Sequence, residues 1–185
     1  MQFNKHPRLE GTHAPFSASQ CHWLRYDDAK AVDTYKTKKA RERGTILHAW
    51  AQTTINLGIK QARSKTTLCS FVNDAIGYRM NTEVLLYYSD RFYGTADAIC
   101  FRDNTLRIHD LKTGDTPASM EQLMVYAAYF CLEYGHRPGD INIELRIYQN
   151  DEIVYHIPSV DEIAHIMDKI IHLNKILEKV DKEEV

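Results

Sequence analysis

Asp110 and Lys112 form a carboxylate–amine pair at the end of an otherwise apolar segment, LRIHDLKTG (residues 106–114). Because side chains alternate along a strand, both would point to the same face as Leu106 and Ile108. That face has the apolar character of a protein core until it becomes charged at Asp110. A buried charge is costly without a partner, so this pair is the first candidate for chemistry.

A second carboxylate, Asp97, lies in the preceding apolar segment. A two-residue hairpin loop at 103–104, whose Asp-Asn composition favours such a turn, would place Arg102 opposite Thr105 and Asp97 opposite Asp110. Directly opposed side chains lie about 4.5–5.5 Å apart at Cβ, where like charges repel each other. A divalent cation would turn this repulsion into coordination, and hard oxygen ligands favour Mg²⁺ or Mn²⁺.

Lys112 would project beside these two carboxylates. Its amine could orient or deprotonate a water molecule that attacks a phosphate, or stabilise the negative charge that develops in the transition state. The alternative interpretation is a surface Asp–Lys pair at a frayed strand end, without a function.

The elements that must position these residues follow from the hydrophobic pattern. Apolar spacing predicts helices over 16–31, 36–58, 66–80, 116–135 and 159–180. Ser17 or Ser19 could cap the first of these, Thr116 and Pro117 suit the start of the fourth, and Gly58 and Gly135 are typical helix ends. Segments 82–88, 91–101 and 105–112 predict an antiparallel meander, and 141–149 and 152–158 predict a further strand pair.

Composition limits the class of protein. A chain of 185 residues with 44% hydrophobic and 26% charged residues is typical of one folded domain, and a net charge of −2 implies that any affinity for nucleic acid is local. No apolar run approaches the roughly 20 residues that span a membrane, and no signal peptide is visible, so we expect a cytoplasmic protein without a membrane partner. The cysteines form no CxxC pair, so no iron–sulfur cluster is expected, and Cys100 and Cys131 are predicted core residues.

Four segments, in order, resemble the motifs of the PD-(D/E)XK nuclease superfamily. They are RGTILHAWA (43–51) on a predicted helix, GTADAI (94–99) and IHDLKTG (108–114) on predicted strands, and QLMVYAAY (122–129) on the following helix. The arrangement is most similar to the RecB-like exonuclease branch, which includes CRISPR-associated and phage-encoded members.

The resemblance implies an α/β protein (α+β by sheet type) with a restriction-endonuclease-like core, in which a central mixed sheet contains the antiparallel meander and is flanked by helices. It implies one nuclease domain over residues 1–185. This domain would comprise a helical part at 1–80, the catalytic sheet and helix at 81–158, and a C-terminal helix at 159–180.

The resemblance also implies roles for individual residues. Asp97 and Asp110 would bind Mg²⁺ or Mn²⁺, assisted by the carbonyl of Leu111, and His48 would supply a further ligand from its helix. Lys112 would be the catalytic lysine. In many members of the family the second acidic position is Glu, where this chain has Asp110, and either residue can bind a metal.

Two residues of the following helix complete the implied site. Gln122 would lie near the scissile phosphate or Lys112, and Tyr126, four residues later, would share its side of the helix and contact DNA. The residue pattern alone allows other interpretations. Tyr126 continues the apolar stripe of Leu123 and could be a core residue, and His48 could be a histidine packed between apolar neighbours of its helix. Gln122 fits a site residue and a structural residue equally well.

A basic segment, KTKKARER (36–43), precedes the first of these motifs. Its side chains at Lys38, Lys39, Arg41 and Arg43 could hold a phosphate backbone, or could simply form a solvated helix face.

Together these features predict a metal-dependent DNA nuclease, most simply an exonuclease that acts on DNA ends or single strands. A catalytically inactive DNA-end-binding or regulatory module with the same fold, and a structure-specific endonuclease, are the alternatives. Because the chain is short for this branch, a homo-oligomer or a protein partner is also expected.

Overall fold

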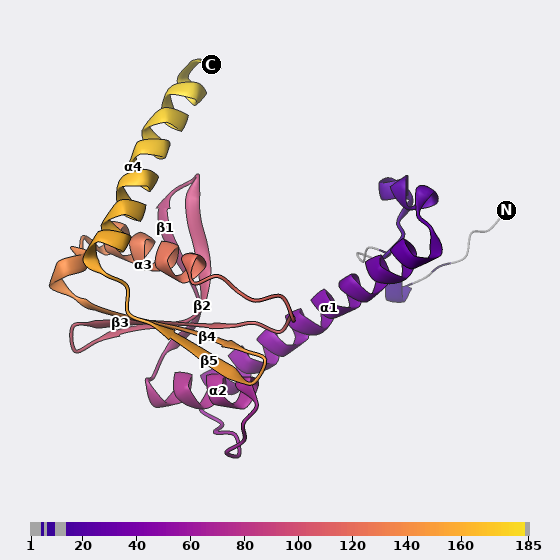
Figure 1. Ribbon diagram of the computed structural model, residues 1–185, viewed down its shortest axis with the longest axis horizontal. Coiled ribbons are helices and arrows are strands. Elements are labelled where there is room, and N and C mark those ends of the chain that lie inside the picture. The colour runs from indigo at the N-terminus through magenta and orange to yellow at the C-terminus, as the bar shows by residue number, and fades with distance from the viewer. Residues whose placement is uncertain (1–4, 6, 10–13, 184–185) are drawn as a thin grey trace. The chain divides into compact units, whose positions relative to one another are not determined.

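The computed structural model describes residues 5, 7–9 and 14–183 and divides the chain into two compact units, Met1–Thr45 and Ile46–Val185. The first unit contains the 3₁₀ helices η1 (Pro7–Leu9) and η2 (Ala18–Arg25). Helix α1 (Asp28–Asn56) begins in the first unit and ends in the second. The second unit holds the sheet and the remaining helices (Figure 1).

The helices near the N-terminus differ from the predicted ones. Instead of an α-helix over 16–31, η2 is a short 3₁₀ segment interrupted by non-helical torsion angles at Gln20, and Ser17 precedes it without a side-chain capping bond. Helix α1 begins at Asp28 rather than at residue 36, and the carboxylate of Asp27 accepts the backbone N–H of Lys30 at its first turn (2.8 Å). This is the capping role that short polar side chains play at helix N-termini.

A five-stranded sheet forms the centre of the second unit. Its strands lie in the order β1 (Asn81–Ser89), β2 (Phe92–Arg102), β3 (Thr105–Leu111), β4 (Asn142–Gln149) and β5 (Glu152–His156). The β3–β4 pair is parallel and the other pairs are antiparallel. The predicted fold class, a mixed sheet with an antiparallel meander flanked by helices, is therefore confirmed.

The β2–β3 hairpin has the predicted register. Its loop residues Asp103 and Asn104 both have positive φ angles, 50° and 56°, as a type I′ turn requires. The turn places Arg102 opposite Thr105, and the pairing continues without a slip as far as Ala98 opposite His109.

Helices cover both faces of the sheet (Figure 1). On one face α3 (Glu121–Tyr134) and α4 (Val160–Glu183) pack against the larger apolar core, which includes Leu106 and Ile108 of β3. On the other face α2 (Thr67–Gly77) contributes Phe71 and Val72 to a smaller core, together with Ala51 near the end of α1. A short 3₁₀ helix, η3 (Pro138–Asp140), precedes β4.

The start of α3 was predicted wrongly, whereas its end was predicted correctly. The helix begins at Glu121, not at residue 116, because the preceding loop is held by the side chain of Gln149, which donates to the carbonyl of Thr116 (2.7 Å) and accepts from the N–H of Ala118 (3.0 Å). Gly135 ends the helix in the left-handed conformation, with φ of 71°.

Two further expectations concern burial and membranes. Cys100 and Cys131 are buried core residues, as predicted. None of the helices in the described part of the chain has the length and apolar content needed to cross a membrane.

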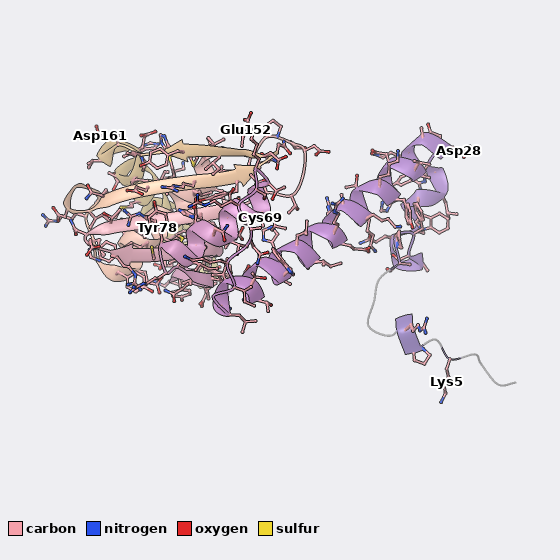
Figure 2. All side chains as sticks on the ribbon, turned by 90° about the horizontal axis from the view of Figure 1, so that it is seen from below. Lys5, Asp28, Cys69, Tyr78, Glu152 and Asp161 are labelled. Atoms are coloured by element: carbon pink, nitrogen blue, oxygen red, sulfur yellow. The ribbon has the colours of Figure 1, made fainter. Side chains whose placement is uncertain are left out.

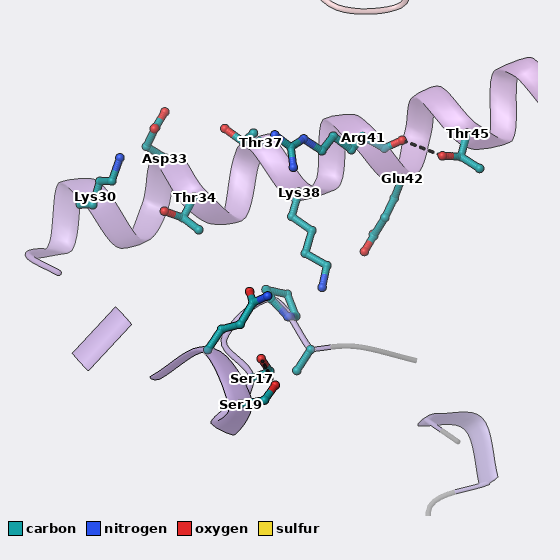
Figure 3. A pocket seen from close by; sticks show the side chains of 13 residues that line it. Ser17, Ser19, Lys30, Asp33, Thr34, Thr37, Lys38, Arg41, Glu42 and Thr45 are labelled. Atoms are coloured by element: carbon teal, nitrogen blue, oxygen red, sulfur yellow. Dashed lines mark hydrogen bonds between the residues drawn. The ribbon is translucent and has the colours of Figure 1, made fainter. Parts of the chain in front are cut away.

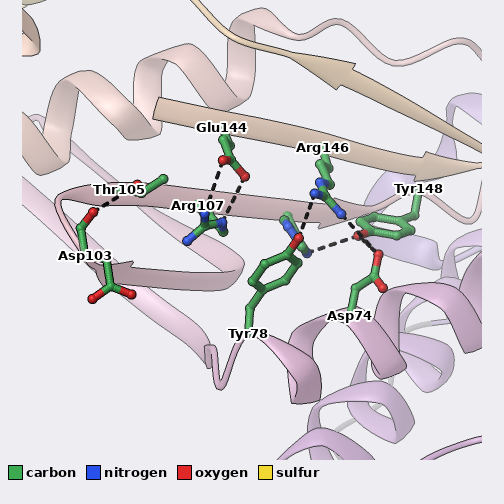
Figure 4. A network of polar contacts seen from close by, with 9 residues as sticks. Asp74, Tyr78, Asp103, Thr105, Arg107, Glu144, Arg146 and Tyr148 are labelled. Atoms are coloured by element: carbon green, nitrogen blue, oxygen red, sulfur yellow. Dashed lines mark hydrogen bonds and ion pairs between the residues drawn. The ribbon is translucent and has the colours of Figure 1, made fainter. Parts of the chain in front are cut away.

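A polar network lies between α2 and the sheet, on the face opposite α3 (Figure 4). The hydroxyl of Tyr148 donates to Asp74 (2.7 Å) and contacts Nδ1 of His109 (3.2 Å), while Arg146 donates to Asp74 and to the hydroxyl of Tyr78. Since the one hydroxyl proton of Tyr148 goes to Asp74, Nδ1 of His109 is the donor in their contact. Burial, followed by the nearby arginines, lowers the pKa of His109 to about 3, so this histidine is neutral.

Removing the hydroxyl of Tyr148 would leave Nδ1 of the buried His109 without a partner and would take one of two donors from Asp74. We expect Tyr148→Phe to lower the free energy of unfolding by about 1–3 kcal/mol, measured by urea denaturation. Tyr155→Phe is the matched control, because Tyr155 is exposed, and should change stability by less than about 0.5 kcal/mol. Equal stability of the two variants would contradict the role of the network.

Candidate metal and phosphoryl-transfer site

The candidate site lies where β2 and β3 separate. Their ladder ends at Ala98 opposite His109, while β3 continues along β4. The carboxylate of Asp97 occupies the fork, and its Oδ2 accepts the backbone N–H of Leu111 (2.9 Å). The backbone pairing predicted at Asp97–Asp110 therefore stops one position earlier, and a side chain replaces it.

Asp110 is buried on the α3 side of the sheet, with only 2% of its surface exposed. Its Oδ1 accepts a hydrogen bond from Nζ of Lys112 (3.1 Å), whereas its Oδ2 lies 2.9 Å from the same nitrogen but receives no hydrogen bond. Burial first, and then the charge of Asp97, raises the pKa of Asp110, while Lys112 opposes the shift. The two oxygens of this nearly buried carboxylate thus share one ammonium group, beside another acid.

Lys112 connects Asp110 to helix α3. Its ammonium group also donates to Oε1 of Gln122 (2.8 Å), and Nε2 of Gln122 donates to the hydroxyl of Tyr126 (3.0 Å). The Asp–Lys pair is therefore part of a chain of hydrogen bonds rather than a frayed surface pair. Lys112 thus acts here as a hydrogen-bond donor to two acceptors.

Tyr126 packs against the larger core, as the apolar stripe of α3 indicated. Its ring edge lies over Gly94 of β2, where an added Cβ would come within 2.8 Å of the ring. Gly94, the first residue of the GTADAI segment, is thus required for this close approach. A contact between Tyr126 and DNA remains a prediction.

A group of potential metal ligands lies beside the fork. Ligand atoms of His48, Glu83 and Asp97 all lie within 4.8 Å of one another, and Nδ1 of His48 is 3.5 Å from Oδ2 of Asp97. Two carboxylates with one imidazole form a donor set that suits Mn²⁺, Mg²⁺ and, through the imidazole, softer divalent ions. Asp110 is not a member of this compact group, although its charge is coupled to Asp97 and His48.

The electrostatics of this group favour a cation. The pKa of His48 is raised chiefly by its hydrogen bond to Asp97, and the pKa of Glu83 is raised by burial and then by the charge of Asp97. The raised pKa favours the protonated form of His48 in the metal-free protein, in the place where a divalent ion would bind. Metal binding would release that proton, because imidazole binds a metal only in its neutral form.

Glu83 was missed by the sequence analysis. It falls opposite Asp97 in the β1–β2 pair, between Thr82–Ala98 and Val84–Ala96, and has an unusual positive φ of 51°. The register near the turn is shifted by an irregularity between Tyr87 and Ser89. Pairing extended from the turn without this shift would place Val84, not Glu83, opposite Asp97.

The remaining predicted site residues have different surroundings. The backbone N–H of Leu111 is held by Asp97, and a role for its carbonyl as a ligand stays a prediction. Lys38, Lys39, Arg41 and Arg43 all belong to the first unit, whereas the ligand group belongs to the second.

Within the first unit, basic side chains of α1 face a pocket. Lys38 and Arg41, with Lys30, contribute to the lining of a cavity of about 690 Å³ (Figure 3). Asp33 and Glu42 lie among the same lining residues, so the cavity is only weakly positive. Lys39 instead lies over the ring of Tyr35, 5.3 Å from its centroid.

Comparison of this chain with models of protein families, with curated proteins and with solved structures finds no match.

The burial of Asp110 makes a testable prediction about stability. Its pKa is raised in the folded protein, so the stability that it contributes is complete below its unfolded pKa and is lost as the pH rises through its folded pKa. We expect Asp110→Asn to stabilise the metal-free protein at neutral pH, by on the order of 1 kcal/mol, in thermal denaturation with EDTA.

Asp97→Asn is the matched control, since Asp97 pairs with His48 and accepts from Leu111; it should give no such gain. Excess Mn²⁺ should raise the melting temperature of the wild-type protein by more than it raises that of the Asp110→Asn variant. A melting temperature that Mn²⁺ leaves unchanged in the wild type would contradict metal binding at this site.

Proposed function

We propose that this protein is a metal-dependent DNA nuclease, which hydrolyses phosphodiester bonds at DNA ends or in single strands. The observation that carries the proposal is the buried carboxylate of Asp110, which lies beside the ammonium group of Lys112 and close to the acidic group at Asp97. Such a concentration of acidic groups supports binding of a divalent cation, and the adjacent amine supports chemistry on an anion.

The donor set fits Mg²⁺ or Mn²⁺. Asp97, Glu83 and His48, whose ligand atoms lie together, would hold the ion, and Asp110, which lies outside this group, is a further predicted ligand. The ion would supply Lewis-acid stabilisation of the phosphate and activation of a water molecule. Hydrolysis would form a bond from the water oxygen to phosphorus and break one phosphorus–oxygen ester bond, and the leaving oxygen would take up a proton.

Within this reaction Lys112 would stabilise negative charge on the phosphate. Its ammonium group donates to Asp110 and Gln122 and retains a third N–H. Gln122, held in turn by Tyr126, restrains the amine in one position. Pre-positioned donors of this kind contribute to catalysis because they need not reorganise as charge develops.

The test is cleavage of end-labelled linear DNA, single-stranded DNA and a covalently closed circle, with Mn²⁺ and with EDTA. We expect Mn²⁺-dependent release of nucleotides from the linear substrates, and a loss of about 100-fold or more for Lys112→Ala and for Asp110→Asn. Glu83→Gln should weaken the response to metal, because it removes a charged ligand.

Asp168→Asn and Lys175→Ala, two exposed positions on α4, serve as controls and should retain full activity. Activity of Lys112→Ala and Asp110→Asn at the wild-type level, or activity in EDTA, would overturn the mechanism. Binding of DNA ends without cleavage by the folded wild type would support the inactive binding module instead, and cleavage of the closed circle would indicate an endonuclease.

A further inference from the structure

Strand β5 forms one edge of the sheet and is unusually apolar for an exposed edge. In Figure 2, where Glu152 is labelled at its start, the strand runs along the border of the sheet. Its central residues Ile153, Val154 and Tyr155 are 46%, 51% and 48% exposed. Two further apolar side chains, Ile157 and Val160, continue this exposed surface beyond the strand.

The outer side of β5 has no partner in the described part of the chain. Hydrogen bonds of its backbone to other elements are confined to β4. The opposite edge of the sheet, strand β1, has a partner. There the backbone N–H of Tyr87 donates to the carboxylate of Glu133 on α3 (2.8 Å). Natural proteins usually protect an edge by keeping the strand short or with charged residues, proline, a bulge or a covering element. β5 has five residues and a carboxylate at its start, but no lysine, proline or bulge interrupts it.

The sequence of β5 is complementary to itself in antiparallel pairing. If two copies pair over the full strand around Val154, each Glu152 faces His156 of the other copy, and each Ile153 faces Tyr155. The carboxylate and the imidazole form a favourable cross-strand pair, as do the aliphatic and aromatic side chains. No like charges oppose each other, and the arrangement has the two-fold symmetry of common homodimers.

We infer that the β5 edge is an interface with a second copy of this chain, which joins the two five-stranded sheets into one continuous sheet. The pairing would satisfy the open backbone groups of both edges and cover Ile153, Val154 and Tyr155. This inference is independent of the proposed nuclease activity, because no residue of the candidate metal site belongs to β5.

The first test is the molar mass of the full-length protein in solution, by light scattering coupled to gel filtration over the micromolar range. We expect a dimer for the wild type and a monomer for Val154→Lys, in which two introduced charges meet at the symmetry axis. Leu85→Lys on β1 is the matched control, since Leu85 is equally exposed at 53%, and should remain a dimer.

The second test uses charge pairing and does not depend on the folding of Val154→Lys. Glu152→Lys and His156→Glu should each raise the dissociation constant of their own homodimer by about tenfold. An equimolar mixture of the two variants should form a heterodimer of near wild-type affinity, because the introduced lysine faces the introduced glutamate and the native Glu–His pair is kept on the other side.

A monomeric wild type over the whole range would overturn the inference and leave the edge for pairing with another protein. The inference would also be overturned if Val154→Lys remained a dimer and the mixed variants showed no preference for the heterodimer. The interface would then lie elsewhere on the protein.

Discussion

The burial of the carboxylate of Asp110 is the constraint around which the candidate site is built. With 2% of its surface exposed, this side chain has lost the water that would stabilise its charge, and such a loss costs free energy unless a partner replaces it. The fold compensates in part with the ammonium group of Lys112, but it also places Asp97 close enough to raise the pKa of Asp110 further. Stability is thus reduced where the acids gather, as is common in sites that bind a cation or perform chemistry.

The neighbouring residue on the same strand shows the contrast. His109 points to the opposite face of the sheet, where it is neutral and bonded to Tyr148. There Tyr148 and Arg146 bond to Asp74 and Tyr78, although Nε2 of His109 and Nε of Arg146 have no hydrogen-bond partner. One step along β3 therefore separates a network that holds a neutral histidine from a cluster of acids in which the pKa of Asp110 is raised.

Much of the site could be predicted because its determinants are local. The Asp103–Asn104 turn sets the β2–β3 register, and the alternation of side chains then directs Asp110 and Lys112 to one face. The spacing of Gln122 and Tyr126 by one helical turn likewise brings their side chains into contact.

The parts that could not be predicted depend on contacts between segments far apart in the sequence. The start of α3 is delayed by Gln149, a residue of β4, whose side chain bonds to the backbone of the preceding loop. Glu83 reaches Asp97 only because the β1–β2 register shifts near the turn. Neither effect leaves a signal in the residues beside it, since a one-residue shift depends on packing rather than on local composition.

The sequence by itself determined the alternation that gathers Asp110 and Lys112, the hairpin that brings Asp97 near them, and the mixed class of the fold. Only the tertiary structure decided that the β2–β3 ladder would open one pair early, so that the carboxylate of Asp97 caps Leu111 and faces His48 and Glu83. The reason is physical. Turn type and side-chain alternation are set by neighbouring residues, whereas the point at which two strands separate depends on the competing pairing of β3 with β4 and on the helices packed against both faces.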